Sequence, residues 1–247
     1  MKMKKWIAGT AMALAITFVF PLFSNAQGLN VMPQGHPQHD QAFSMKEMEV
    51  IKQRYIQDLA IIEDAELLYL QDQQELAEAI KNNTATKTWA KFETLNNIET
   101  SSSRLGTVGD ILVAYNYRWG NLNVAFVGHA AIVSNNNART VESFPKTGVQ
   151  YFTNDWKAKS KVYGLWVKGA TTTKYKNAAS YAQNQIGKKY NWNFVNKFAT
   201  DKFYCSQLVW RAWYNQGINV DYIKVDTIVT PMELAKSNNT TIFYHRG

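Results

Sequence analysis

Cysteine is nearly absent from this 247-residue chain, which contains only Cys205. A lone cysteine cannot form an internal disulfide, and it cannot build a zinc site of the kind that several cysteines make together. The sequence therefore excludes a disulfide scaffold and a cysteine-based zinc site. The thiol is then either a small buried apolar group or a reactive group, and the residue alone leaves both interpretations open.

Histidine is also scarce, with four in the chain. His36 and His39 lie in an N-terminal stretch without periodicity, and His245 is the third residue from the end. His129 lies inside the strand-like segment 124–133. A histidine in a strand is usually an ordinary core or surface residue. Paired with the only cysteine, however, His129 is the natural candidate for a base.

Long hydrophobic runs are missing except at the start of the chain. Three lysines are followed by an apolar stretch over residues 6–23 and by Ser24-Asn25-Ala26, a small-x-small cleavage site. This order predicts a cleaved signal peptide over residues 1–26 and a secreted or cell-envelope location. The alternative is an uncleaved membrane anchor, although Pro21 and Ser24 interrupt a run already short for a membrane span.

Acidic residues are outnumbered by basic ones. Removal of residues 1–26 takes away three lysines and no acidic residue, so the formal net charge falls from +8 to +5 over the remaining 221 residues. The lysines are scattered instead of clustered. This pattern favours anionic surroundings such as cell-wall polymers or a lipid surface, and it argues against specific nucleic-acid binding.

The first part of the mature chain reads as a flexible leader over residues 27–43 and a helical segment over residues 44–100. Ser44 and Glu47 form a capping-box pattern, and apolar residues seven apart predict one long helix to about Lys81. Three interpretations stay open: a helix that packs along the rest of the protein or folds into a hairpin, a coiled-coil or partner-binding stalk, and a pro-segment that covers the site. Charged residues such as Asp58 between the apolar positions weaken the second.

Residues 101–247 change character and predict one α+β domain. The apolar period switches towards two, which predicts strands at residues 110–117, 124–134, 140–143, 149–152 and 162–167. Helices are then expected at residues 174–186 and 205–216, with a last short helix that begins at Thr230-Pro231.

Cys205 falls at the start of one of these helices. Free backbone amides and the helix dipole would there stabilise a thiolate. A base such as His129 must itself be oriented by a third group, and Glu142 lies on the strand that follows His129 across an asparagine-rich turn. Hairpin pairing would bring the two side chains together. An exposed strand glutamate is the alternative.

The ordered set of short motifs resembles a known family. The motifs are Gly109-Asp110-Ile111, Gly128-His129-Ala130, Val141-Glu142-Ser143, Gly148-Val149, Gly187-x-x-Tyr190-Asn191, residues 203–209 (FYCSQLV) and Thr230-Pro231. They look like the permuted NlpC/P60 cysteine hydrolases, papain-like enzymes of the YiiX/YaeF type that are related to lecithin retinol acyltransferase. The resemblance runs from about residue 106 to residue 238 and does not include residues 44–100.

The resemblance implies a circularly permuted papain-like fold, with an antiparallel sheet packed on helices and preceded here by the long helical segment. It implies a catalytic triad of Cys205, His129 and Glu142. Two tyrosines are expected to contact the substrate, Tyr190 and Tyr204, the second of which directly precedes the cysteine. Asp110 matches an aspartate with a structural role. The implied reaction is cysteine-dependent amide or peptide hydrolysis through a thioacyl-enzyme, with no metal or cofactor required.

The substrate is less determined than the chemistry. Amide bonds of cell-wall peptide (peptidoglycan) fit an exported basic protein. A lipid acyltransferase or phospholipase would use the same triad, and a catalytically silent binding module is a third reading. Four aromatic residues near the expected site either line an apolar acyl pocket or belong to the core: Trp119, Trp156, Tyr190 and Trp192. The oligomeric state is left open.

Overall fold

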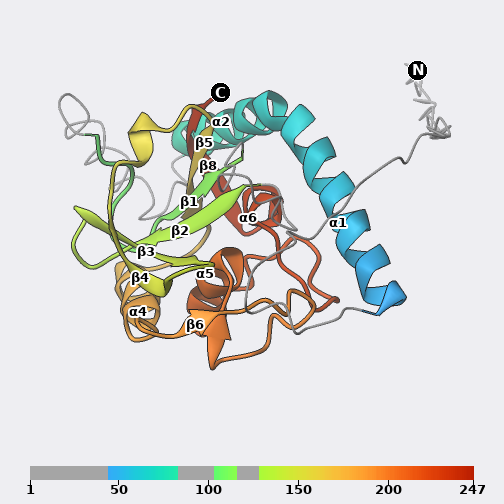
Figure 1. Ribbon diagram of the computed structural model, residues 1–247. Helices are drawn as coiled ribbons and strands as arrows, with labels where there is room; N and C mark the ends of the chain where they lie inside the picture. Colours follow the sequence, from blue (N-terminus) through green and yellow to red (C-terminus); the bar gives the residue numbers. More distant parts are fainter. Residues whose placement is uncertain (1–43, 83–102, 116–127) are drawn as a thin grey trace, which may run out of the picture. The chain divides into compact units, whose positions relative to one another are not determined.

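The computed structural model describes residues 44–82, 103–115 and 128–247 (Figure 1). The predicted signal peptide over residues 1–26, the leader over residues 27–43 and residues 83–100 of the helical segment lie outside the described residues. Across the described ranges, no helix is long and apolar enough to cross a membrane.

Two helices begin the described chain. Helix α1 (Met45–Glu63) starts with the predicted capping box, in which the Ser44 amide donates to Glu47 Oε2 at 2.8 Å. The prediction of a single helix to Lys81 is wrong at Asp64, whose amide donates to the carbonyl oxygens of Ala60 and Ile62 and ends α1. Helix α2 (Ala65–Lys81) follows. The break allows α1 to pack on α6 and α2 to pack on β8, described below.

A six-stranded antiparallel sheet forms the centre of the molecule, in the order β4-β3-β2-β1-β5-β8. Five of its strands overlap predicted ones, and residues 116–117 and 124–127 of those predictions lie outside the described residues. The sixth, β8, was not predicted although its residues favour strands. The strands are β1 (Ile111–Ala114), β2 (His129–Val133), β3 (Arg139–Phe144), β4 (Gly148–Thr153), β5 (Val162–Val167) and β8 (Thr240–Arg246).

Three further helices follow the order expected from the sequence. They are α4 (Thr172–Gln183), α5 (Cys205–Tyr214) and α6 (Pro231–Lys236), and both α4 and α5 end a turn or less before the predicted boundary. The smaller elements are the 3₁₀ helix η1 (Trp156–Ala158) and a parallel pair, β6 (Lys189–Tyr190) and β7 (Lys202–Phe203). Helices α4 and α5 both contact β2 and β3 (Figure 1).

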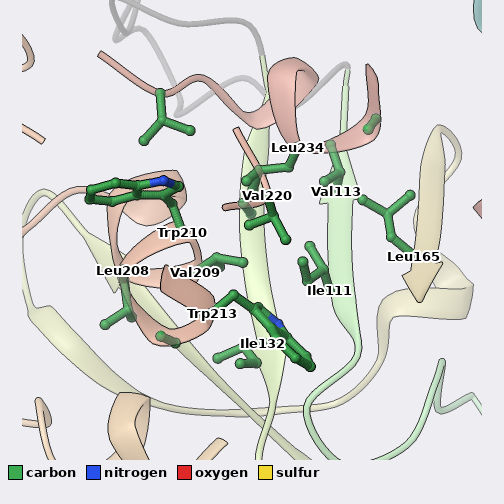
Figure 2. Close-up of a cluster of buried hydrophobic side chains, with 14 of the residues drawn as sticks. Ile111, Val113, Ile132, Leu165, Leu208, Val209, Trp210, Trp213, Val220 and Leu234 are labelled. Carbon is green, nitrogen blue, oxygen red and sulfur yellow. The ribbon is translucent and has the colours of Figure 1, made fainter. Parts of the chain in front are cut away.

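Helix α5 is the central element of the core. Its first six residues and two of the last four are buried, and its apolar side chains pack against the sheet (Figure 2). The labelled core residues come from β1, β2, β5, α5, α6 and the loop after α5: Ile111, Val113, Ile132, Leu165, Leu208, Val209, Trp210, Trp213, Val220 and Leu234. Each such side chain contributes about 1.5–3 kcal/mol by burial. The predicted α+β class, with an antiparallel sheet packed on helices, is confirmed.

Replacement of Leu165 by alanine tests this core. Leu165 is fully buried on β5, so Leu165→Ala should lower the free energy of unfolding by about 2–5 kcal/mol through lost burial and a residual cavity. Urea unfolding followed by circular dichroism measures the change. The matched control is Leu67→Ala on α2, at a side chain that is 55% exposed, for which a change within about 0.5 kcal/mol is expected. Equal losses for the two variants would contradict this assignment of the core.

Candidate active site

His129 is the first residue of β2, and the backbone before it is tightly constrained. Gly128 has a φ of +89°, and a Cβ at this position would lie 2.2 Å from the carbonyl oxygen of Ala114 on the neighbouring strand β1. Only glycine adopts this conformation so close to another backbone. Gly128 therefore fixes the point at which the His129 side chain leaves the sheet.

The β2–β3 hairpin brings Glu142 to His129. The two strands pair antiparallel, with Ile132 opposite Val141, and His129 Nε2 lies 2.7 Å from Glu142 Oε2. Both side chains are almost completely buried, at 0% and 3% exposure. A buried carboxylate this close to one ring nitrogen fixes the orientation of the imidazole and leaves Nδ1 for another partner.

Cys205 is the residue that acts on this imidazole from α5. It is the first residue of the helix, and the two side chains are close enough to shift each other's pKa. The backbone amides of Ala130 and Ser206 also donate to the sulfur. Gln207 holds the first turn of α5, because its Oε1 accepts a hydrogen bond from the amide of Tyr204 at 3.1 Å. The structure thus brings together the three residues expected at the site.

The charges of these three groups depend on one another. Burial by itself opposes a charged imidazole, yet the hydrogen bonds to Cys205 and Glu142 outweigh it and raise the pKa of His129 to about 9. Burial also raises the pKa values of Cys205 and Glu142, but the hydrogen bond and charge of His129 leave both below their ordinary values. The lowered pKa of Cys205 and the raised pKa of His129 both favour a thiolate paired with an imidazolium.

Two residues outside the predicted triad hold the other oxygen of Glu142. The indole Nε1 of Trp156 donates to Glu142 Oε1 at 3.0 Å, and the hydroxyl of Thr140 donates to the same oxygen. Thr140 could have been found from sequence, because residues two apart in a strand share a face of the sheet. The sequence named Trp156 as an aromatic residue near the site but did not predict its contact with Glu142, since Trp156 lies beyond the next strand.

Aromatic rings pack against the imidazole. Phe144, at the end of β3, has its ring centroid 4.5 Å from that of His129, and the Trp156 ring stacks at 5.9 Å. The fully buried Trp156 therefore belongs to the core and does not line an acyl pocket. These rings exclude water from the His129–Glu142 pair, which strengthens the interaction.

The two tyrosines expected at the substrate differ in their surroundings. Tyr190 is 7% exposed, packs edge-to-face on Trp192 and has its pKa raised by burial and by the nearby charge of Cys205. Tyr204 is completely buried, and its hydroxyl accepts from the amide of Val229 at 3.2 Å. Tyr204 therefore has a place in the core instead of at a substrate. Trp119 lies outside the described residues.

Other sequence candidates lie away from this site. Asp110 accepts hydrogen bonds from the amide and hydroxyl of Thr107, which fits the structural role expected of it. His245 lies in β8, where its Nε2 is 2.9 Å from the Tyr115 hydroxyl. In the part of the chain that the structure describes, no group of three or more histidine, cysteine, aspartate or glutamate side chains is arranged to hold a metal.

Comparison with known proteins identifies a family for the catalytic part of the chain. Residues 107–241 match the family model of the permuted papain-like amidase enzymes, YaeF/YiiX, C92 family. The chain belongs to this family. It is therefore a papain-like cysteine hydrolase of the amidase type.

Among solved structures, the chain is similar to the "metalloprotein yiiX" from Escherichia coli O157:H7. The identity is 18% and the TM-score is 0.43, over 57% of this chain and 97% of that one. A search of curated proteins gives no match.

Alkylation of the single thiol tests the Cys205–His129 pair. We expect iodoacetamide to react with Cys205 at neutral pH, since the pKa of Cys205 is lowered. The imidazolium should be lost as the pH rises through about 9, which gives a second step in the pH profile. His129→Asn should slow alkylation at pH 7 about tenfold or more, because burial without the imidazolium raises the thiol pKa.

The matched control for this experiment is His245→Asn, which alters the histidine of β8 and should leave the alkylation profile unchanged. Mass spectrometry of the intact protein measures the rate at each pH. An unchanged profile in His129→Asn would contradict the ion pair.

Proposed function

We propose that this protein is an exported cysteine hydrolase that cleaves amide or peptide bonds of cell-wall peptide through a thioacyl-enzyme. The observation that carries the proposal is the buried His129–Glu142 hydrogen bond beside Cys205, together with pKa shifts of His129 and Cys205 that favour the charged pair. Glu142 orients the imidazole, His129 acts as base and acid, and Cys205 acts as nucleophile.

The first half-reaction is acylation. The thiolate of Cys205 attacks the carbonyl carbon of the substrate, and the electron pair of the carbonyl bond moves to its oxygen. The amide of Cys205 is among the first amides of α5, which have no acceptor within their own helix, and it would donate to this oxyanion. The C–N bond then breaks while the His129 imidazolium gives its proton to the leaving amine. The acyl group remains on sulfur as a thioester.

The second half-reaction is hydrolysis of the thioester. Neutral His129 takes a proton from water, and the resulting hydroxide attacks the acyl carbon. The C–S bond breaks, which releases the carboxylic acid and restores the thiolate and the imidazolium. One water is consumed for each amide cleaved, and no redox partner enters the balance.

Cell-wall peptide is the substrate class that the remaining features favour. The family is one of amidases. The N-terminal signal-peptide pattern would deliver the protein outside the cytoplasm, and the excess of five positive charges over residues 27–247 would favour an anionic polymer. A lipid acyl ester reacts by the same steps, so the two substrate classes must be compared directly.

The substrate test uses protein beginning at Gln27. We expect turnover of purified muropeptides, seen by mass spectrometry as products that have gained one water, and no release of fatty acid from phospholipid vesicles. Cys205→Ser should lower muropeptide turnover about 10³-fold or more, since a buried hydroxyl is a far weaker nucleophile than a thiolate. Turnover of vesicles alone would replace the amide substrate with a lipid ester, and turnover by Cys205→Ser would exclude the thioacyl mechanism.

Glu142→Gln tests the orienting acid. A glutamine keeps the shape and a hydrogen-bond acceptor but removes the charge that helps to raise the pKa of His129. The alkaline limb of the activity profile should therefore move to lower pH, and kcat should fall about 10- to 100-fold with little change in KM. Glu75→Gln, at an exposed residue of α2, is the matched control. A glutamine variant with the wild-type pH profile would assign Glu142 a purely structural role.

A further inference from the structure

Helix α1 lies outside the family match over residues 107–241, yet it belongs to the same core as the catalytic residues. Ile51 and Ile61 of α1 are buried in the hydrophobic cluster that contains Leu208 and Val209 of α5. Helix α1 packs on α6, and the loop directly before α6 is the segment that holds the start of α5. This placement raises the question of what α1 contributes to the site.

The buried face of α1 carries two charged residues between its isoleucines. Ile51, Arg54, Asp58 and Ile61 follow one another at spacings of three or four, so they share one face of the helix. Asp58 is completely buried, at 0% exposure. A buried carboxylate is costly unless it is hydrogen-bonded, so a simple hydrophobic contact would not need an aspartate at this position.

Asp58 binds the residue that begins α6. The hydroxyl of Thr230, the N-cap of α6, donates to Asp58 Oδ1 at 2.6 Å, and the same hydroxyl accepts from the amide of Glu233 at 3.2 Å. Arg54 reinforces this contact, because it pairs with Asp226 and lies 3.7 Å from Glu233. Helix α1 therefore holds the chain at both sides of Val229.

Val229, directly before Thr230, holds both neighbours of Cys205. Its amide donates to the Tyr204 hydroxyl at 3.2 Å, and its carbonyl oxygen accepts from the Ser206 hydroxyl at 2.8 Å. The side chains on either side of the nucleophile are thus both hydrogen-bonded to Val229, which holds the first turn of α5. Any displacement of Val229 moves the thiol relative to the imidazole on β2.

We propose that Asp58 is a positioning residue for Cys205, which it acts on through Thr230 and Val229. The helix α1 is then a permanent part of the catalytic unit and not a segment that must leave the site. The role rests on the proposed function of Cys205 as nucleophile, but its central readout, the reactivity of the thiol, can be measured without a substrate.

The charged residues around the Asp58–Thr230 hydrogen bond are consistent with a contact that stays in place. Lys197 is buried and donates to Asp221 at 2.5 Å, to Asp226 at 3.2 Å and to the carbonyl oxygen of Ile228 at 3.3 Å. Burial and the neighbouring Asp221 raise the pKa of Glu233 to about 8. A protonated Glu233 would leave fewer negative charges beside Asp58, whose Oδ1 accepts the Thr230 hydroxyl.

The experiment compares three aspartate variants in the otherwise complete protein. Asp58→Ala removes the acceptor and should slow alkylation of Cys205 at pH 7 roughly tenfold, shift the alkylation profile to higher pH, and lower kcat on muropeptide with little change in KM. Asp58→Asn keeps an acceptor oxygen and should restore alkylation to within about twofold of wild type. Asp64→Asn, at the exposed residue that ends α1, is the control: it removes a charge from the same helix without favouring its continuation, and it should change nothing.

A loss of melting temperature in Asp58→Ala, with the alkylation profile and kcat at wild-type values, would overturn the proposal and make the contact a matter of stability alone. If Asp58→Ala does not fold, Thr230→Val breaks the same hydrogen bond from the other side, and Thr230→Ser should restore it. Failure of both Asp58→Ala and Thr230→Val to fold would also count against positioning. An altered alkylation profile without muropeptide turnover by wild type would support positioning while rejecting the proposed substrate.

Discussion

Burial of the His129 imidazole between a carboxylate and a thiol is the constraint on which the rest of the site depends. A ring with no exposure to water cannot keep a charge unless both nitrogens have strong partners. Glu142 supplies one partner and Cys205 the other, and together they reverse the effect of burial on the pKa of the ring. The same lack of water that makes an unpaired ring costly makes the paired ring a strong base and acid.

That constraint extends to the surrounding residues. Because Glu142 is buried as well, its second oxygen needs donors, and Thr140 and Trp156 provide them. The hairpin must keep its register, since a slip by one residue would turn Glu142 to the other face of the sheet. The glycine before His129 is required for a related reason, because no side chain fits between this turn and strand β1.

The order of the residues along the chain has a structural consequence. The base and the acid lie on neighbouring strands, 76 and 63 residues before the nucleophile, so their pairing is local while the approach of Cys205 is not. The start of α5 must be held against the sheet from outside the hairpin. Val229 makes those contacts on one side, and α1, from a part of the chain beyond the family pattern, holds the residue next to Val229. A segment that the family pattern lacks can therefore affect the geometry of the site.

The sequence by itself determined what depends on local pattern. The two-residue period predicted five of the strands, and the capping residues Ser44 and Thr230 predicted two helix starts. The turn between β2 and β3 offered Glu142 as a neighbour of His129 and left an exposed glutamate as the alternative, and the structure has the two side by side. These features need only neighbouring residues, so the pattern contains them.

Only the tertiary structure decided what depends on distant contacts. Strand β8 exists because it pairs with β5, more than seventy residues earlier, and the break at Asp64 follows from the separate partners of α1 and α2. The burial of Tyr204 and the donor role of Trp156 also follow from residues far away in the chain. Packing between two segments that are far apart in the chain leaves no periodic pattern in the sequence of either segment. The sequence therefore identified the reactive side chains, and the fold decided which residues surround them.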